Sequence, residues 1–197
     1  MIIDKRLLKL RLAAISRGEP VLRERSLFKL LELIKEKKPS KILEIGTNEG
    51  LTAIAMLQAN EKSVLTGIEI DEEKVKIALK NFDNFGLTER ARIFCADAGD
   101  VLSAASGTYD FIFLDGPKGH YYRYLSDILR LMNKGGILFA DNVYFRGYVN
   151  NKVRTPHRFA TVKHGMENFL KAITRDGKLK TEIIDIDDGI SITEKLD

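Results

Sequence analysis

Apolar residues along this chain first follow the spacing of helices and then alternate between strand-like and helix-like runs. Helical spacing occupies residues 7–15 and 22–34, and Gly18-Glu19-Pro20 breaks the pattern between them. From Lys41 onward, short apolar runs alternate with helical segments, which predicts repeated βαβ units. The predicted strands are residues 42–45, 64–70, 93–96, 111–114 and 137–140; the predicted helices between them are residues 51–57, 72–85 and 121–132, with only a short turn after 93–96.

The C-terminal part of the chain departs from this alternation. A basic, irregular segment covers residues 144–157, and a helix is predicted over 161–173. Residues 181–186 and 190–193 flank Asp187-Asp188-Gly189, a pattern typical of an antiparallel hairpin. Gly135-Gly136 is predicted to cap the helix that precedes the fifth strand. The pattern predicts an α/β fold: a mostly parallel seven-stranded sheet, helices on both faces, and an antiparallel C-terminal strand.

Length and composition fit one globular domain. A chain of 197 residues matches the prior of about 100–200 residues per domain, so we expect a single domain over 1–197, with N-terminal helices in 1–38 and the sheet in 41–197. Hydrophobic residues make up 44% and charged residues 30%, which is globular. No apolar run approaches the roughly 18 residues of a membrane span, and the N-terminus lacks a signal-peptide core, which predicts a cytoplasmic protein without a membrane partner. The single cysteine, Cys95, is predicted to be a buried structural thiol.

The stretch from Lys41 to Gly50 is typical of a buried strand that enters a glycine turn, and Glu69 ends the next strand. The spacing is Gly-x-x-x-Gly (Gly46 and Gly50), and the carboxylates of Glu44 and Glu49 flank the turn and would repel a pyrophosphate. A nucleoside cofactor without phosphate fits better. S-adenosylmethionine has that form: Glu69 suits its ribose hydroxyls, and its carboxylate can accept backbone N–H groups at a helix N-terminus.

Acidic residues follow several predicted strands. Open α/β sheets bind ligands outside the carboxyl ends of their strands, and Asp97, Asp115 and Asp141 all fall there. Asp115 and the pair Asp141-Asn142 follow neighbouring strands, so their side chains should lie close together. Three oxygen donors suit a hard cation, namely Mg²⁺, Mn²⁺ or Ca²⁺, whereas zinc would need cysteine or histidine. We therefore predict a divalent-metal site.

Lys118 lies one turn beyond Asp115, within reach of a substrate hydroxyl held at this metal. A metal lowers the pKa of a bound hydroxyl, and a lysine can then accept the proton as general base. The nearby positive charge is expected to depress the pKa of Lys118 itself.

Taken together, these motifs resemble those of the cation-dependent O-methyltransferases, the family of catechol and caffeoyl-CoA O-methyltransferases and their bacterial relatives. The resemblance covers nearly the whole chain from about Glu19. The motifs that carry it are Leu43-Glu-Ile-Gly-Thr-Asn-Glu-Gly50, Gly67-Ile-Glu-Ile-Asp71, Ala96-Asp-Ala98, Phe111-Ile-Phe-Leu-Asp-Gly-Pro-Lys118 followed by Tyr121, Gly135-Gly-Ile-Leu-Phe-Ala-Asp-Asn-Val143 with Arg146-Gly147, and Asp188-Gly189-Ile190.

The resemblance implies a Rossmann-like S-adenosylmethionine methyltransferase fold and a role for each matching residue. Glu44, Gly46 and Thr52 would line the methionine end of the cofactor, Glu69 would bind the ribose, and Asp97 and Ala98 would lie at the adenine. Asp115 would border the cofactor and, with Asp141 and Asn142, bind the metal, with Lys118 as base. The sequence departs from the family at Gly116-Pro117, where an alanine-containing turn is more usual and which could shift Lys118, and at Ala96, where glycine is common.

The methyl acceptor is less constrained. The chain has little room for the loops that the plant enzymes use for a CoA thioester, which leaves a catechol-like small molecule or 5-hydroxyuridine in tRNA, a substrate of part of the bacterial branch. A basic and aromatic stretch adjoins the site and could track phosphates and stack a base. Its residues are Arg154, His157, Arg158, Lys163 and His164, near Tyr144, Phe145 and Tyr148. The alternative is an ordinary solvated loop and helix face, and no histidine has ligand spacing.

Two other functions remain open at this stage. A nicotinamide-dependent dehydrogenase would share the strand-turn-helix pattern, although the acidic turn argues against it. A noncatalytic tRNA-binding protein would have no need of Lys118 and the acidic cluster. The resemblance also implies a homodimer, for which the amphipathic N-terminal helices offer a surface.

Overall fold

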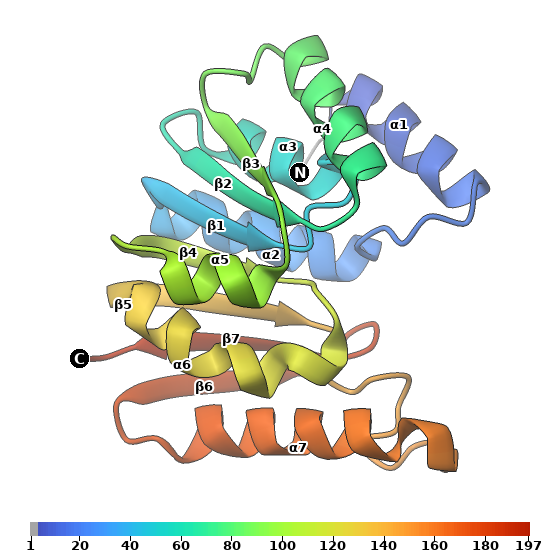
Figure 1. The fold of residues 1–197 in the computed structure, drawn as a ribbon, viewed down its shortest axis with the longest axis vertical. Helices are drawn as coiled ribbons and strands as arrows, with labels where there is room; N and C mark the ends of the chain where they lie inside the picture. The colour runs from blue at the N-terminus through green and yellow to red at the C-terminus, as the bar shows by residue number, and fades with distance from the viewer. Residues whose placement is uncertain (1–3) are drawn as a thin grey trace.

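The computed structural model describes residues 4–197, and its central feature is one seven-stranded sheet with strand order β3-β2-β1-β4-β5-β7-β6 (Figure 1). The first five strands are parallel, and β7 is antiparallel to both of its neighbours. The strands are β1 (Lys41–Ile45), β2 (Val64–Glu69), β3 (Ala91–Cys95), β4 (Tyr109–Leu114), β5 (Met132–Asp141), β6 (Leu179–Ile184) and β7 (Ile190–Lys195). The predicted fold class is confirmed, including the C-terminal hairpin at one sheet edge.

Helices cover both faces of the sheet. In Figure 1, α5 and α6 lie in front of the sheet and α2 and α3 lie behind it, while α7 packs in the same core layer as α6. The helices are α1 (Lys5–Ser16), α2 (Glu24–Lys37), α3 (Leu51–Ala59), α4 (Glu72–Asn84), α5 (Ala98–Ala104), α6 (Tyr121–Leu131) and α7 (Ala160–Arg175), with 3-10 turns at Lys118–His120 and His157–Phe159. None of the helices in residues 4–197 is long and apolar enough to cross a membrane.

Alternation along the strands divides the core into two layers. In β1, Ile42 packs with the layer that contains α2 and α3, whereas Leu43 and Ile45 pack with the layer that contains α6 and α7. Burial on both sheet faces explains why the central strands are mostly apolar. Leu7 of α1 and Leu27 of α2 belong to the same cluster as Ile42, so the N-terminal helices share the core of the sheet.

The order in which strands are added to the sheet reverses between β1 and β4. β2 and β3 lie on one side of β1, and β4 pairs in parallel with β1 on the other side. Such a switch point opens a crevice at the carboxyl ends of the strands. The glycine turn that follows β1 lies there, and a Cβ at Gly46 (φ 89°) would lie 2.5 Å from the backbone oxygen of Asp115. Only glycine therefore lets the turn approach the end of β4 this closely.

Three local predictions were wrong. The turn expected after the third strand is the helix α5; its sequence AGDVLSA is short and contains few large apolar residues, so its helical pattern is weak. Gly135-Gly136 does not cap α6, which ends at Leu131; both glycines lie within β5, where the pairing with β4 shifts register between Tyr109 and Phe111. Cys95 is exposed because β3 is one of the two edge strands of the sheet.

Candidate active site

A cleft of about 520 Å³ opens at the switch point, outside the carboxyl ends of the parallel strands. Its walls come from the segments that follow β1, β2, β3, β4 and β5, together with the loop between α1 and α2. Seven of the ten predicted site residues line it: Gly46, Glu69, Asp97, Ala98, Asp115, Lys118 and Asn142. The sheet therefore collects residues that are up to 96 positions apart in the sequence, counting from 46 to 142.

The carboxylate of Glu69 is fixed at the end of β2. Its Oε2 accepts a hydrogen bond from the backbone N–H of Asn48 at 2.8 Å, and its Oε1 accepts from the N–H groups of Ile70 at 2.8 Å and Asp71 at 3.0 Å. Asn48 has a positive φ of 47°, which turns its N–H toward β2. These bonds hold the acid at the cleft wall in a defined orientation.

Asp97 and Ala98 lie at the far side of the cleft, where β3 is followed by α5. Asp97 is the N-cap of α5, and its Oδ1 accepts a hydrogen bond from the Gly99 N–H at 2.8 Å. Arg123 of α6 lies 3.5 Å from the same oxygen. The cap fixes the start of α5 and leaves Ala98 in the cleft wall.

Two of the predicted cofactor residues do not line the main cleft. Thr52 borders a narrow recess beside it, which shares Gly46, Asn48 and Asp115 with the cleft. Glu44 is fully buried on the α2 and α3 side of the sheet, and neither of its carboxylate oxygens has a hydrogen-bond partner within residues 4–197. Burial raises the pKa of Glu44 well above its usual value, and the charges of Asp115 and Glu69 raise it further.

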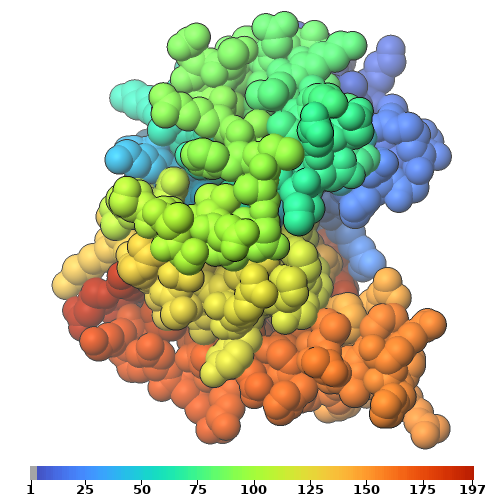
Figure 2. All heavy atoms as spheres, viewed as in Figure 1, coloured from blue at the N-terminus to red at the C-terminus, as the bar shows by residue number. Residues whose placement is uncertain are grey.

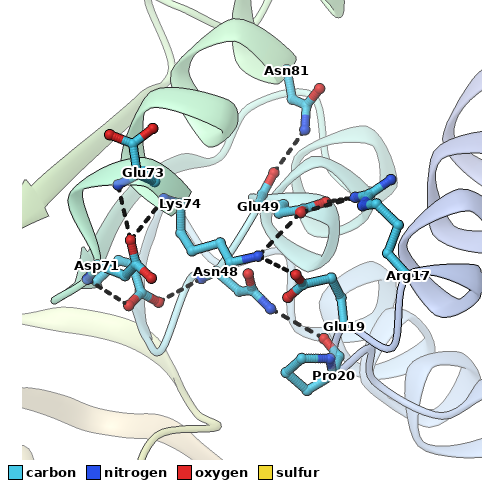
Figure 3. A network of polar contacts seen from close by, with 10 residues as sticks. Arg17, Glu19, Pro20, Asn48, Glu49, Asp71, Glu73, Lys74 and Asn81 are labelled. Carbon is cyan, nitrogen blue, oxygen red and sulfur yellow. Dashed lines mark hydrogen bonds and ion pairs between the residues drawn. The ribbon is translucent and has the colours of Figure 1, made fainter.

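The negative charge of the buried Glu49 is compensated by two cations, whereas the sequence pattern predicts that this carboxylate would repel a pyrophosphate. The Arg17 guanidinium lies 2.7 Å from its Oε2 and the Lys74 ammonium 3.4 Å from its Oε1 (Figure 3). Two cations pair with Glu49, and the raised pKa of Glu44 favours its neutral form. These two acids would therefore repel a pyrophosphate only weakly. Exclusion of a dinucleotide must rest on other observations.

Asp115 directly follows β4 and Asp141 is the last residue of the neighbouring β5; since Leu114 pairs with Ala140, the two acids lie at the same level of the sheet. Asp141 is only 3% exposed, and its Oδ1 has no hydrogen-bond partner in the described part of the chain. Burial raises the pKa of Asp141 to about 7, and the negative charge of Asp115 adds to this shift. Asn142, with a φ of 56°, follows directly and reaches the cleft. A buried carboxylate oxygen without a partner, beside a second carboxylate, is an arrangement that a cation would stabilise.

Lys118 is held between an acid and a phenol. Its Nζ donates to Oδ1 of Asp115 at 2.7 Å and to the hydroxyl of Tyr121 at 2.8 Å. Burial alone would lower the pKa of Lys118, but Tyr121 and Asp115 together raise it above its usual value. This direction is opposite to the one predicted from sequence, because Asp115 contacts the ammonium directly. Gly116-Pro117 does not carry Lys118 away from the cleft.

Sequence reasoning gave no role to several residues that shape the site. The Tyr121 hydroxyl lies within hydrogen-bond distance of two backbone oxygens, that of Leu114 at 2.8 Å and that of Asp141 at 3.1 Å, and donates its one proton to either, so it ties the ends of β4 and β5 together. Arg17, directly after α1, and Lys74 of α4 contact the glycine turn. Asp188 accepts from the N–H groups of Arg146 and Gly147, which fixes the segment after Asn142. Only Tyr121 and Asp188 lie in stretches that the motifs mark.

The sheet order, the cleft at the switch point and the glycine turn define the class of Rossmann-like α/β folds. The structure of the O-methyltransferase TomG from Streptomyces achromogenes, solved in complex with SAM, has the same fold: the TM-score is 0.86 at 20% identity, covering 100% of this chain and 92% of that one. At this identity the likeness bears on the fold alone.

Sequence comparison gives the family. A family model described as O-methyltransferase matches residues 17–196. The tapetum-specific methyltransferase 1 of Arabidopsis thaliana is 28% identical over 185 residues, which cover 91% of this chain and 78% of the relative. The catechol O-methyltransferase of Niastella koreensis is 36% identical over 127 residues, 61% of this chain and 58% of the relative. The chain belongs to the cation-dependent O-methyltransferase family and is an S-adenosylmethionine-dependent O-methyltransferase. The dehydrogenase and the noncatalytic tRNA-binding alternatives are therefore wrong.

Proposed function

We propose that this enzyme needs a divalent cation, Mg²⁺ or else Mn²⁺ or Ca²⁺, and methylates an acceptor hydroxyl placed beside Asp115, Asp141 and Asn142. The observation that carries the proposal is the buried Asp141 carboxylate, whose Oδ1 lacks a partner in the described residues, next to a second acid. These three oxygen-donor side chains would hold the cation. When bound, the cation supplies positive charge that makes a neighbouring hydroxyl easier to deprotonate.

The cofactor would lie along the cleft from the glycine turn to α5. Glu69, already oriented by backbone N–H groups, would accept hydrogen bonds from the ribose hydroxyls. Asp97 and Ala98 would border the adenine, while Gly46 and Thr52 would border the methionine end. Glu44 would contribute to the methionine end of the cofactor site from below the glycine turn, through its buried carboxyl.

Methyl transfer from S-adenosylmethionine is a displacement at carbon. The acceptor oxygen forms a bond to the methyl carbon while the carbon–sulfur bond breaks. The electron pair of the broken bond stays on sulfur, which gives S-adenosylhomocysteine. The protein orients the two reactants and excludes water. Lys118 would accept the proton of the acceptor hydroxyl, and its contact with Tyr121 would keep its Nζ at that position.

The proposal is tested by methyl transfer from labelled S-adenosylmethionine to a catechol, with Mg²⁺ or with EDTA. We expect transfer with Mg²⁺, loss of transfer with EDTA, and recovery when Mg²⁺ is added back. The variant D141N should lose cation-dependent transfer, whereas the matched variant D83N, at an exposed position of α4, should keep it. Transfer that persists after exhaustive chelation would contradict the cation requirement.

A second acceptor, 5-hydroxyuridine in tRNA, is supported by the charge of the segment after Asn142. Arg154, His157 and Arg158 are exposed there. The aromatic rings are less available than expected, because Phe145, Tyr148 and Phe159 pack against one another with centroid distances of 5.5 to 5.6 Å. The same labelled assay with tRNA that contains 5-hydroxyuridine separates the acceptors: labelled tRNA supports the nucleic-acid substrate, and labelled catechol alone supports the small molecule.

A homodimer is also proposed, with α1 in the contact. Figure 2 shows α1 in blue at one side of the molecule, next to α4. Leu8, Leu12 and Ile15 of α1 are 45%, 58% and 55% exposed, and their spacing places them on one helix face. Sedimentation equilibrium of the wild type and of L12E would test this, because a monomeric variant is expected only if this face is buried between copies.

A further inference from the structure

The loop between α1 and α2 (residues 17–23) forms part of the cleft wall through Glu19 and Pro20. Two contacts attach it to the glycine turn. Arg17 pairs with the buried Glu49, and the Asn48 side-chain amide donates to the Pro20 backbone oxygen at 3.2 Å (Figure 3). A change in the position of this loop would therefore widen or narrow the cleft on this side.

Lys74 ties the same loop to α4, which also contributes to the cleft wall. Its side chain extends from the first turn of α4 toward the loop, and its Nζ lies 2.5 Å from Oε1 of Glu19 and 3.4 Å from Oε1 of Glu49 (Figure 3). The three side chains are only 21%, 24% and 6% exposed. The contact with Glu19 raises the pKa of Lys74, so the ammonium stays charged at neutral pH. One cation thus joins three segments: the loop, the glycine turn and α4.

We propose that Lys74 is a positioning residue that closes the α1–α2 loop over the cofactor cleft and so sets the rate of nucleoside exchange. Its contacts join protein groups to one another, and breaking them frees the loop from α4. An ion pair between partly exposed side chains is weak enough to open on its own and is screened by salt, as a gate that must open in every turnover requires.

This inference rests on the proposed placement of the cofactor in the cleft. It predicts a kinetic effect that differs from the effect of losing a direct contact with the ligand. A gate that acts equally on entry and exit changes the association and dissociation rate constants by the same factor and leaves Kd unchanged. Loss of a direct ligand contact raises mainly the dissociation rate constant.

The test uses labelled S-adenosylhomocysteine, which carries no sulfonium charge, so that removal of a lysine does not alter long-range attraction. Association is followed by rapid filtration, and dissociation by a chase with unlabelled ligand. We expect both rate constants to increase on the order of tenfold in K74M, with Kd unchanged. The variant K74R should restore slow exchange. K76M, which removes an exposed α4 lysine paired with Glu72 and Glu73, is the matched control and should behave as the wild type.

Two further measurements distinguish the loss of this ion pair from a general destabilisation of the loop. Added salt should speed exchange in the wild type and have little effect in K74M, because the screened ion pair is then already absent. In the K74M background, E19Q should have no additional effect, because Glu19 acts through Lys74.

Each remaining outcome decides against the gate. Unchanged rates in K74M would overturn it, and a raised Kd with an unchanged association rate would make Lys74 a direct ligand contact. If the wild type does not bind S-adenosylhomocysteine at all, the placement of the cofactor fails. If the wild type binds and K74M matches it, only the gate fails.

Discussion

The Nζ atom of Lys118 lies 2.7 Å from Oδ1 of Asp115, so the proposed base and a proposed cation ligand share one ion pair. While this pair persists, Lys118 stays protonated and cannot accept a proton. A cation that draws on the Asp115 carboxylate would weaken its hold on the ammonium. The pair would therefore link occupation of the proposed cation site to the protonation state of the proposed base.

Replacing Lys118 with methionine should lower kcat and leave cofactor binding largely intact. A positioned general base typically contributes about 10²- to 10⁴-fold, so we expect a loss in that range. Steady-state kinetics together with titration of S-adenosylhomocysteine binding would check it. The control is K134M, which removes an exposed lysine of β5. A variant that keeps full kcat would show that Lys118 is not the base.

Replacing Glu44 with glutamine should stabilise the cofactor-free protein at high pH. The folded-state pKa of Glu44 is raised above the unfolded value, so the folded protein holds this proton more tightly. The stability that this gives is complete below about pH 4 and is lost as pH rises toward the folded pKa. Urea unfolding in EDTA at pH 5 and pH 8 should show a larger gain for E44Q at pH 8. The exposed-site variant E61Q should show no such gain, and an equal gain at both pH values would contradict the shift.

Gly46 should tolerate no side chain. A Cβ there would lie 2.5 Å from the Asp115 backbone oxygen, and its φ of 89° also disfavours alanine. We expect G46A to lose at least about 1–3 kcal/mol of unfolding free energy and to bind S-adenosylhomocysteine poorly. G177A is the matched control, because a Cβ at Gly177 meets no atom within 4 Å. Wild-type stability and binding in G46A would show that the turn can move away from β4.

Arg154 and Arg158 distinguish the two acceptors. If these exposed cations contact tRNA phosphates, each alanine variant should weaken tRNA binding and reduce the slope of log affinity against log salt by about 1. Kinetics with a catechol should not change, because these side chains would then contact only the nucleic acid. Filter binding across a salt series would measure the slopes, with R175A at the far end of α7 as control. Unaltered slopes in both variants would count against tRNA as the acceptor.

Local sequence patterns were sufficient for the sheet and for most of the cleft. Apolar strands separated by helical spacing gave the parallel order of elements, and acids at strand ends gave Asp115 and Asp141 because a parallel sheet places all carboxyl ends together. Gly46 and Glu69 followed from the same rule.

The rest depends on contacts that no local pattern records. Glu49 is neutralised by Arg17 and Lys74, which are 32 and 25 positions away in the sequence. The raised pKa of Lys118 arises from the side-chain directions of Asp115 and Tyr121, which spacing does not specify. The exposure of Cys95 depends on β3 being an edge strand, and strand order cannot be read from one strand.

The position of Cys95 has a practical consequence. The chain has one cysteine and no tryptophan, and the thiol is exposed on β3, one residue before Ala96 in the cleft wall. A single environment-sensitive dye coupled to this thiol would stand beside the proposed adenine end of the cleft, in a protein without indole fluorescence of its own. Arrival and departure of the nucleoside could then be followed optically in the wild-type sequence.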